Sequence, residues 1–303
     1  MRHDIEFPGH GGTTLRGWLY VPEGARSGPA LVMAHGFSAT IDMGIDAFAR
    51  VFCAAGITVL AYDQRNLGLS DGEPRQEINI WAQARDYRRA IDWLEQRPEV
   101  DPRRIGIWGS SFSGGEVLVV GGCDRRVAAV IANVPFASLP DVAQRQPEPG
   151  AFEAIRTALF DESGNGPADA GGDPIGPLAV VADERVELPA FLPFQEATDW
   201  FREYGLRRSK TWQNRVSLRA LPTSSTPAFD PAVCAPHIAP RALLMVLASE
   251  DRMAPVDGAR QTFANAGEPK RLEVIEGDHF VVYQGPGFER SSAVMRDFLL
   301  EHL

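Results

Sequence analysis

Ser111 has the residue type and the sequence surroundings of a catalytic nucleophile. It lies in the run Gly109-Ser110-Ser111-Phe112-Ser113-Gly114-Gly115, after the apolar stretch 105–108 and before the helix-compatible stretch 116–120. A serine on a tight turn between a strand and a helix has its hydroxyl exposed above the sheet. Small neighbours suit a strained serine backbone and a close approach of strand and helix. The pattern predicts nucleophilic catalysis by Ser111, with Ser113 at a position where glycine is usual.

A serine hydroxyl is a weak nucleophile, and the chain offers a base and an acid to activate it. His279 follows the predicted final strand 271–275, and Asp251 follows the apolar run 242–247. An imidazole can take the serine proton, and a carboxylate can fix the imidazole tautomer and stabilise its charged form. Because sites in open α/β sheets gather at the carboxyl ends of the strands, residues distant in sequence can meet there. We therefore predict a catalytic triad of Ser111, Asp251 and His279.

Two backbone amides complete the predicted machinery. A tetrahedral intermediate develops negative charge on an oxygen atom, which needs hydrogen-bond donors placed in advance. The N–H of Phe112 directly follows the nucleophile, and the N–H of Phe37 lies in His35-Gly36-Phe37, after the apolar run 30–34. One such donor is typically worth about 2.7–4 kcal/mol of barrier. The amides of Phe37 and Phe112 are the predicted oxyanion hole.

Other residues compete for each of these roles. Ser110 and Ser113 are rival nucleophiles, and Ser111 could instead serve only as a helix N-cap, where serine is favoured. The acid could come from one of three other carboxylates: Glu250, Asp257 or Asp141. The chain has five further histidines: His3, His10, His35, His237 and His302. The positions of Ser111, Asp251 and His279 directly after predicted strands favour these three residues.

Alternating strand and helix patterns must position these side chains. Apolar runs typical of strands buried on both faces of a parallel sheet lie at 30–34, 57–62, 105–108, 127–134 and 242–247, and a final strand is predicted at 271–275. An opening hairpin is predicted from 5–7 and 15–21. Helical patterns lie at 48–55, 80–94 and 292–302. This alternation predicts an α/β fold with a mostly parallel central sheet flanked by helices.

The alternation stops near residue 136 and resumes after residue 231. The stretch between is rich in Pro, Gly and Asp and contains aromatic, helical-looking segments. We predict a largely helical cap at 136–231, inserted into a core formed by 1–135 and 232–303. Substrate pockets are mostly apolar, so some cap aromatics should line one. The predicted substrate contacts are Phe194, Trp200, Tyr204 and Trp212.

The motifs together resemble those of α/β-hydrolases, in particular serine esterases of the dienelactone-hydrolase-like and acetyl xylan esterase-like group. Besides the Ser111 run, the resemblance covers four segments: 35–38 (HGFS), 63–70 (DQRNLGLS), 251–255 (DRMAP) and 277–279 (GDH). It implies the α/β-hydrolase fold and an acyl-enzyme mechanism without a metal or an organic cofactor. The chain departs from the pattern at Asn66 and Ser113, where relatives usually have glycine. Neither departure removes a catalytic group.

Composition argues against several classes of partner. The 303 residues have a formal net charge of −10, and the three cysteines, Cys53, Cys123 and Cys234, have no metal-binding or disulfide pattern. Such an acidic chain offers no basic patch for nucleic acid or an anionic membrane. The N-terminus lacks the apolar core of a signal peptide, and no apolar run approaches transmembrane length. We expect a cytoplasmic protein that binds a small-molecule, ester-like substrate; a homodimer stays open.

The leading hypothesis is a serine hydrolase that cleaves a small to medium carboxylic ester or lactone through an acyl-enzyme on Ser111. The same machinery could cleave an amide, a thioester or a C–C bond, because the cap pocket selects the leaving group and fold does not settle function. A third hypothesis is a non-catalytic ligand receptor on a hydrolase scaffold. Such receptors often lack a member of the triad, whereas this chain has all three residue types.

Overall fold

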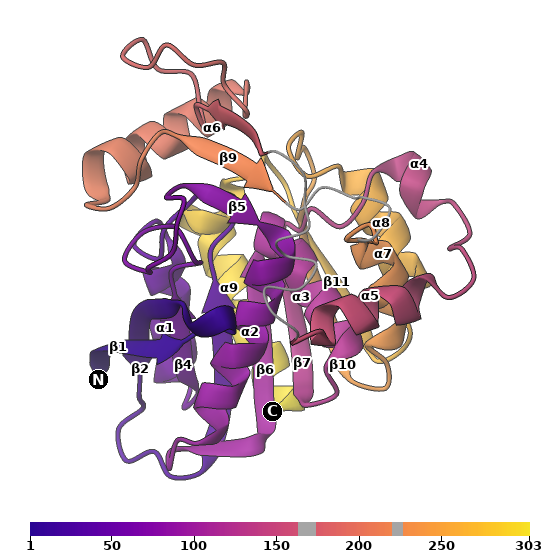
Figure 1. The fold of residues 1–303 in the computed structure, drawn as a ribbon. Coiled ribbons are helices and arrows are strands. Elements are labelled where there is room, and N and C mark those ends of the chain that lie inside the picture. The colour runs from indigo at the N-terminus through magenta and orange to yellow at the C-terminus, as the bar shows by residue number, and fades with distance from the viewer. Residues whose placement is uncertain (163–173, 220–226) are drawn as a thin grey trace.

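The main element of the fold is an eight-stranded sheet with the order β1-β2-β4-β3-β6-β7-β10-β11 (Figure 1). The structure is a computed structural model, and it describes residues 1–162, 174–219 and 227–303. β1 and β2 form the predicted hairpin, β2 and β4 are also antiparallel, and the other neighbouring strands are parallel. The strands are β1 (Arg2–Pro8), β2 (Thr14–Tyr20), β3 (Gly28–Ala34), β4 (Thr58–Tyr62), β6 (Val100–Ser110), β7 (Val127–Asn133), β10 (Ala242–Ala248) and β11 (Lys270–Ile275).

Helices cover both faces of this sheet (Figure 1). Within β3, Leu31 and Met33 pack toward α1 and α9, whereas Ala30, Val32 and Ala34 pack in the cluster that contains α2 and α3. None of the described helices is long and apolar enough to cross a membrane. The helices of the core are α1 (Ile45–Ala54), α2 (Ile80–Glu95), α3 (Phe112–Cys123), α7 (Pro231–Cys234), α8 (Val256–Asn265) and α9 (Gly285–His302).

The predicted α/β fold is confirmed, and most element ends lie within a few residues of the predicted ones. α2 begins at Ile80 because the Asn79 side chain caps it, accepting a hydrogen bond from the Ala82 amide at 3.2 Å. The largest difference is at α9, which begins at Gly285 instead of residue 292. A proline in its first turn, Pro286, suits a helix start because no backbone N–H is needed there. The sequence analysis did not predict α8.

The segment predicted as a cap combines helices with a small sheet. It contains α4 (Pro140–Ala143), α5 (Ala151–Phe160), β8 (Ile175–Leu178), α6 (Gln195–Trp200), the π-helix η3 (Phe201–Arg208) and β9 (Val216–Arg219). β9 pairs with β8 and also, in parallel, with β5 (Glu77–Asn79), which directly precedes α2. This three-stranded sheet joins the segment to the core sequence (Figure 1). The division into 1–135, 136–231 and 232–303 stays a prediction.

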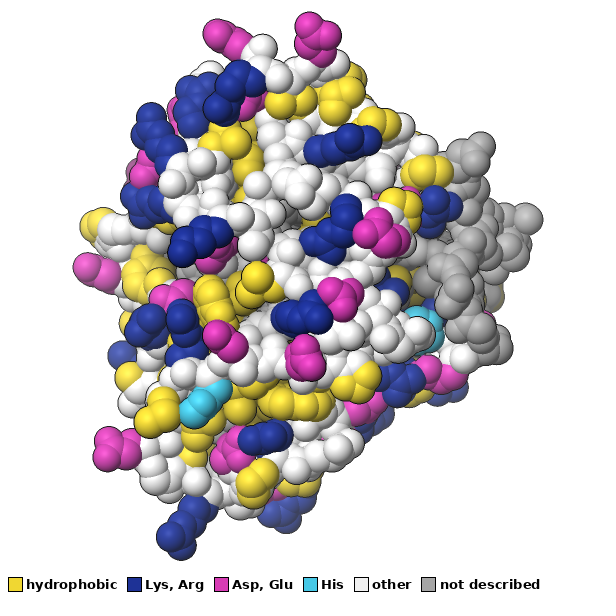
Figure 2. Space-filling model, turned by 60° about the vertical axis from the view of Figure 1, so that its left-hand side comes forward, with side chains coloured by type: hydrophobic (Ala, Val, Ile, Leu, Met, Phe, Trp, Pro, Cys, Tyr) yellow, Lys and Arg dark blue, Asp and Glu magenta, His cyan; other side chains and the backbone are white. Residues whose placement is uncertain are grey.

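Charged side chains of both signs are mixed on the surface. On the face drawn in Figure 2, Lys and Arg side chains are interspersed with Asp and Glu side chains. An ion pair between Arg126 and Asp92 at 2.6 Å joins a turn to α2, and one between Arg89 and Asp92 at 2.9 Å lies within α2. The net negative charge is therefore not collected into one wide acidic field on this face.

Candidate active site

Ser111 lies on a strained turn between β6 and α3. Its backbone has φ 58° and ψ −115°, which few non-glycine residues adopt. A Cβ on Gly109 would lie 2.1 Å from the carbonyl oxygen of Ser113, so the helix can return this close to the strand only because position 109 is glycine. The Ser111 amide donates to the Asn133 carbonyl at 2.8 Å, and the Ser111 carbonyl accepts from the Phe136 amide at 2.9 Å. These bonds hold the serine at the carboxyl edge of the sheet.

The other two serines of the turn point into the protein. The Ser113 hydroxyl is buried, accepts from the Ser110 amide at 2.8 Å and donates to the Ala34 carbonyl at 2.9 Å. The Ser110 hydroxyl is also buried and accepts from the Asn133 side chain at 3.0 Å. This environment favours Ser111 over its two rivals as the nucleophile. Ser113 also joins the turn to the end of β3, a contact that glycine could not make.

The predicted base and acid are in direct contact. His279 Nδ1 lies 2.5 Å from Asp251 Oδ2, and both side chains are buried. The second carboxylate oxygen accepts from the amides of Met253 and Ala254 at 2.9 and 2.8 Å. A carboxylate held in this way fixes the ring and leaves Nε2 for proton transfer. The rival carboxylates are all exposed: Glu250, Asp257 and Asp141.

The loop after β3, residues 35–41, lies against the Ser111 turn and is called the oxyanion loop below. A Cβ on Gly36 would lie 2.9 Å from the Ser110 carbonyl oxygen and 2.9 Å from Ser111 Cβ. The rings of Phe37 and Phe112 are in edge contact at 5.8 Å. Across residues 1–162, 174–219 and 227–303, neither of their amides donates to a protein acceptor. Two unused N–H groups beside Ser111 are the kind of donors that an oxyanion hole requires.

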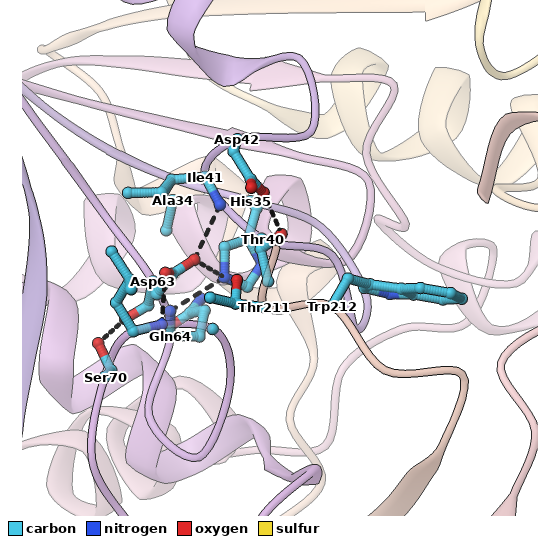
Figure 3. Close-up of polar contacts among 12 residues, drawn as sticks. Ala34, His35, Thr40, Ile41, Asp42, Asp63, Gln64, Ser70, Thr211 and Trp212 are labelled. Carbon is cyan, nitrogen blue, oxygen red and sulfur yellow. Dashed lines mark hydrogen bonds and ion pairs between the residues drawn. The ribbon is translucent and has the colours of Figure 1, made fainter. Parts of the chain in front are cut away.

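His35 holds the start of the oxyanion loop (Figure 3). Its Nε2 accepts a hydrogen bond from the Gln64 amide at 3.0 Å, so its proton is on Nδ1, which donates to the Gly36 carbonyl at 3.0 Å. Complete burial lowers the pKa of His35 to about 4. The ring is therefore neutral near pH 7 and acts as a fixed hydrogen-bonding bridge between two loops.

Asp63 holds the other end of the same loop. One carboxylate oxygen accepts from the Ile41 amide and the other from the Leu69 amide, each at 2.8 Å. Burial raises the pKa of the Asp63 carboxyl to about 7, against the opposing effect of these two N–H donors. Asp63 therefore joins the oxyanion loop to the loop that follows β4.

Asn66, the second departure from the family pattern, occupies a left-handed position. Its φ is 67°, a conformation that glycine adopts freely and asparagine tolerates better than most residues. The Asn66 side chain donates to the Glu77 carbonyl at 2.9 Å. The substitution for glycine thus keeps the turn and adds a bond to β5.

A largely apolar cavity of about 380 Å³ lies beside Ser111 and His279. Among the described residues, the polar side chains of its lining are few: His35, Ser111, Arg219, His279 and Tyr283. Such a lining suits an apolar group held next to a small number of polar anchors. No group of three or more His, Cys, Asp or Glu side chains that could hold a metal ion occurs among the described residues.

The four predicted substrate contacts lie in two different places. Trp200 lines the cavity, together with four other aromatic residues of the predicted cap: Phe136, Phe191, Phe201 and Phe229. Tyr204 stacks on Trp200 at 5.1 Å, outside the lining. The other two are also absent from the described lining: Trp212 stacks on Phe201 at 5.3 Å, and Phe194 lies 5.8 Å from the Arg252 guanidinium. Sequence alone could not separate these groups because all belong to the same aromatic-rich stretch.

The core supplies lining residues that the sequence analysis missed. Met253, Phe280 and Tyr283 all line the cavity. Each lies within four residues of the predicted Asp251 or His279, and this proximity is a signal that could have found them. The hydroxyl of Tyr283 contacts the hydroxyl of Ser110, next to Ser111. Burial raises the pKa of Tyr283 to about 12.

This sheet, with a serine turn and an acid–base pair at its carboxyl edge, is that of an α/β-hydrolase. The crystal structure of the α/β hydrolase GrgF from Penicillium sp. sh18 is similar over 100% of this chain and 99% of that chain, with a TM-score of 0.76 and 30% identity. Residues 11–280 match the X-Pro dipeptidyl-peptidase (S15 family). The chain belongs to this family.

Curated relatives are similar over almost the whole chain. A polyketide transferase, grgF, of Penicillium sp. is 30% identical over 304 residues, which cover 100% of this chain and 97% of the relative. A thiohydrolase, aneE, of Aspergillus aculeatus is 33% identical over 304 residues, with coverage of 94% and 89%. The predicted membership of the α/β-hydrolases is therefore confirmed, and with it the hydrolase class of enzyme.

Proposed function

We propose that the protein is a serine hydrolase that cleaves thioesters of apolar acyl groups through an acyl-enzyme on Ser111. The observation that supports it best is the pairing of Asp251 with His279 at 2.5 Å beside the apolar cavity that Ser111 also lines. The thiohydrolase at 33% identity favours a thioester over the ester or lactone of the leading sequence hypothesis. Thioesters also suit this machinery because a thiol, with a pKa of about 8.5, is a good leaving group.

In the proposed mechanism, Ser111 Oγ attacks the acyl carbonyl while His279 Nε2 accepts its proton. Asp251 stabilises the resulting imidazolium through Nδ1. The amides of Phe37 and Phe112 donate to the oxyanion. The intermediate then expels the thiolate, which takes the proton from His279. Water attacks the acyl-enzyme in the second half, with His279 again as the base, and releases the carboxylic acid and free Ser111.

Hydrolysis of a carboxylic ester or lactone is the second candidate. It uses the same residues and the same acyl pocket, and the motifs shared with serine esterases favour it. Relatives named polyketide transferase and acyltransferase suggest a variant in which an acceptor other than water takes the acyl group. Amide cleavage is supported by the match to the X-Pro dipeptidyl-peptidase (S15 family), whereas C–C cleavage has no specific support beyond the shared machinery.

A series with one acyl chain and different leaving groups tests this proposal. Decanoyl N-acetylcysteamine thioester, ethyl decanoate, decanolactone and a decanoyl amide would be compared by kcat/KM. We expect the thioester to be fastest and Ser111→Ala to lose at least about 10⁴-fold. Mass spectrometry should detect a decanoyl adduct on the native chain and not on the variant. A faster ester or lactone would favour the second candidate, and the absence of both turnover and adduct would favour a receptor.

A further inference from the structure

The backbone immediately after Phe37 is strained and has no side-chain support of its own. Ser38 is buried and adopts a φ of 52°. A non-glycine residue in this left-handed region costs of the order of 1–3 kcal/mol and persists only when its surroundings hold it. Within the described part of the chain, the Ser38 hydroxyl has no hydrogen-bond partner. Another part of the molecule must therefore hold this peptide.

Trp212, from the segment predicted as a cap, supplies that support. Its indole Nε1 donates to the Ser38 carbonyl at 2.8 Å, and its side chain is buried. The ring stacks on Phe201, and a Cβ on Gly205 would lie only 2.6 Å from a ring atom. The indole is thus packed tightly against η3 while its N–H bonds to the oxyanion loop.

A residue close to Trp212 in sequence, Ser209, makes a further contact with the same loop. The Ser209 hydroxyl accepts from the Trp212 amide at 3.1 Å and lies 3.2 Å from the Thr40 hydroxyl. From the core side, His35 bonds to the Gln64 amide at the start of the loop. The oxyanion loop is therefore held by the core at its start and by the segment 209–212 in its middle.

We propose that Trp212 is a positioning residue, whose indole N–H fixes the Ser38 carbonyl and thereby the Phe37 amide. It acts through this peptide, because it does not line the described cavity. The role differs from the substrate contact that the sequence predicted. Since Phe37 stabilises an oxyanion only under the proposed function, the proposal rests on that function. In this proposal, the position of the Phe37 amide depends on how the segment 209–212 packs against the oxyanion loop.

The substitution Trp212→Phe tests this role because it keeps an aromatic ring and removes the donor. We expect kcat for decanoyl thioester to fall about 10- to 100-fold while KM changes less than about twofold, since a displaced oxyanion donor weakens only transition-state binding. The matched control is Trp93→Phe, at a tryptophan that packs on Phe7 in the core, and it should keep both constants. A rise in KM with unchanged kcat would make Trp212 a substrate contact and overturn the proposal, as would two unchanged constants.

Labelling of Ser111 by a fluorophosphonate separates this proposal from the proposed function. The rate does not depend on the natural leaving group, and we expect Trp212→Phe to lower it by a similar factor. If Ser111 of the native chain is labelled but the chain hydrolyses no thioester, the proposed function fails while the labelling comparison still tests Trp212.

If Trp212→Phe does not fold, Ser209→Ala provides a second test because it removes the hydroxyl between Trp212 and Thr40. We expect it to slow labelling about 2- to 10-fold, and an unchanged rate would overturn the proposal.

Discussion

Two regions around the cavity are built from different interactions: the core edge, with Asp251 and His279, and the wall from the segment predicted as a cap, with Phe191 and Trp200, called the cap wall. At the core edge, Asp251 accepts two backbone N–H bonds and contacts His279 at 2.5 Å. In the cap wall, Phe191 stacks on Phe37 at 4.6 Å and Trp200 stacks on Phe280 at 4.8 Å. Hydrogen bonds fix both distance and direction, whereas ring contacts tolerate rearrangement. Substitutions at the core edge should therefore lower kcat or stability, and substitutions in the wall should change the preference for the acyl chain.

Within this comparison of the two regions, Asp251→Asn should have the largest effect. The amide cannot hold the His279 ring in the correct tautomer or stabilise its charged form, so kcat should fall about 10⁴-fold with little change in KM. Steady-state kinetics on the preferred thioester measures it. Asp257→Asn, at an exposed carboxylate in the nearby α8, is the matched control and should retain activity. A loss below tenfold for Asp251→Asn would remove Asp251 from the triad.

Ser113→Ala tests the hydrogen bonds inside the core edge. It leaves the Ser110 amide and the Ala34 carbonyl without their buried partner, which should cost about 1–3 kcal/mol of unfolding free energy. Urea unfolding measures this loss. Ser292→Ala is the control, because that buried hydroxyl donates to the Glu289 carbonyl of its own helix, at 3.3 Å. Equal stability of Ser113→Ala and the native chain would contradict the role given to Ser113.

Trp200→Leu tests the cap wall. The smaller side chain loses contact area with a long acyl group, so kcat/KM for a decanoyl thioester should fall about tenfold, while that for an acetyl thioester should change little. Kinetics across a series of chain lengths measures the difference. An equal loss for both substrates would mean that the wall also supports the catalytic geometry, and the contrast between the two regions would fail.

At Asp63 the expected effect is a change in how the free energy of unfolding varies with pH. Its pKa is raised to about 7 in the folded chain, against about 3.9 in an unfolded one. Between these values the folded state keeps a proton that the unfolded state has lost, so this group's contribution to stability falls as pH rises from about 4 to 7 and is level above. Asp63→Asn should remove up to about 1.4 kcal/mol per pH unit of this slope. Urea unfolding between pH 5 and 8 measures it, and an unchanged slope would contradict the raised pKa.

Local patterns explain why the core could be predicted and part of the cavity could not. Runs such as 242–247 identify a buried strand by themselves, and Asp251 is found because it follows such a run. The pairing of β5 with β9 has no comparable signal, because Ile78 meets Leu218 across 140 residues of sequence and each strand is only three or four residues long. Three-residue strands have too few positions to show alternation.

By itself the sequence determined the α/β class and the positions of the parallel strands along the chain. It also placed Ser111, Asp251 and His279 directly after three of those strands. These features depend on periodicity and turn chemistry, which act over a few residues. Tertiary structure alone decided that Trp200 lines the cavity while Trp212 holds the oxyanion loop. The two tryptophans share a segment and a residue type, and they differ only in the neighbours, Phe280 and Ser38, that distant parts of the chain bring to them.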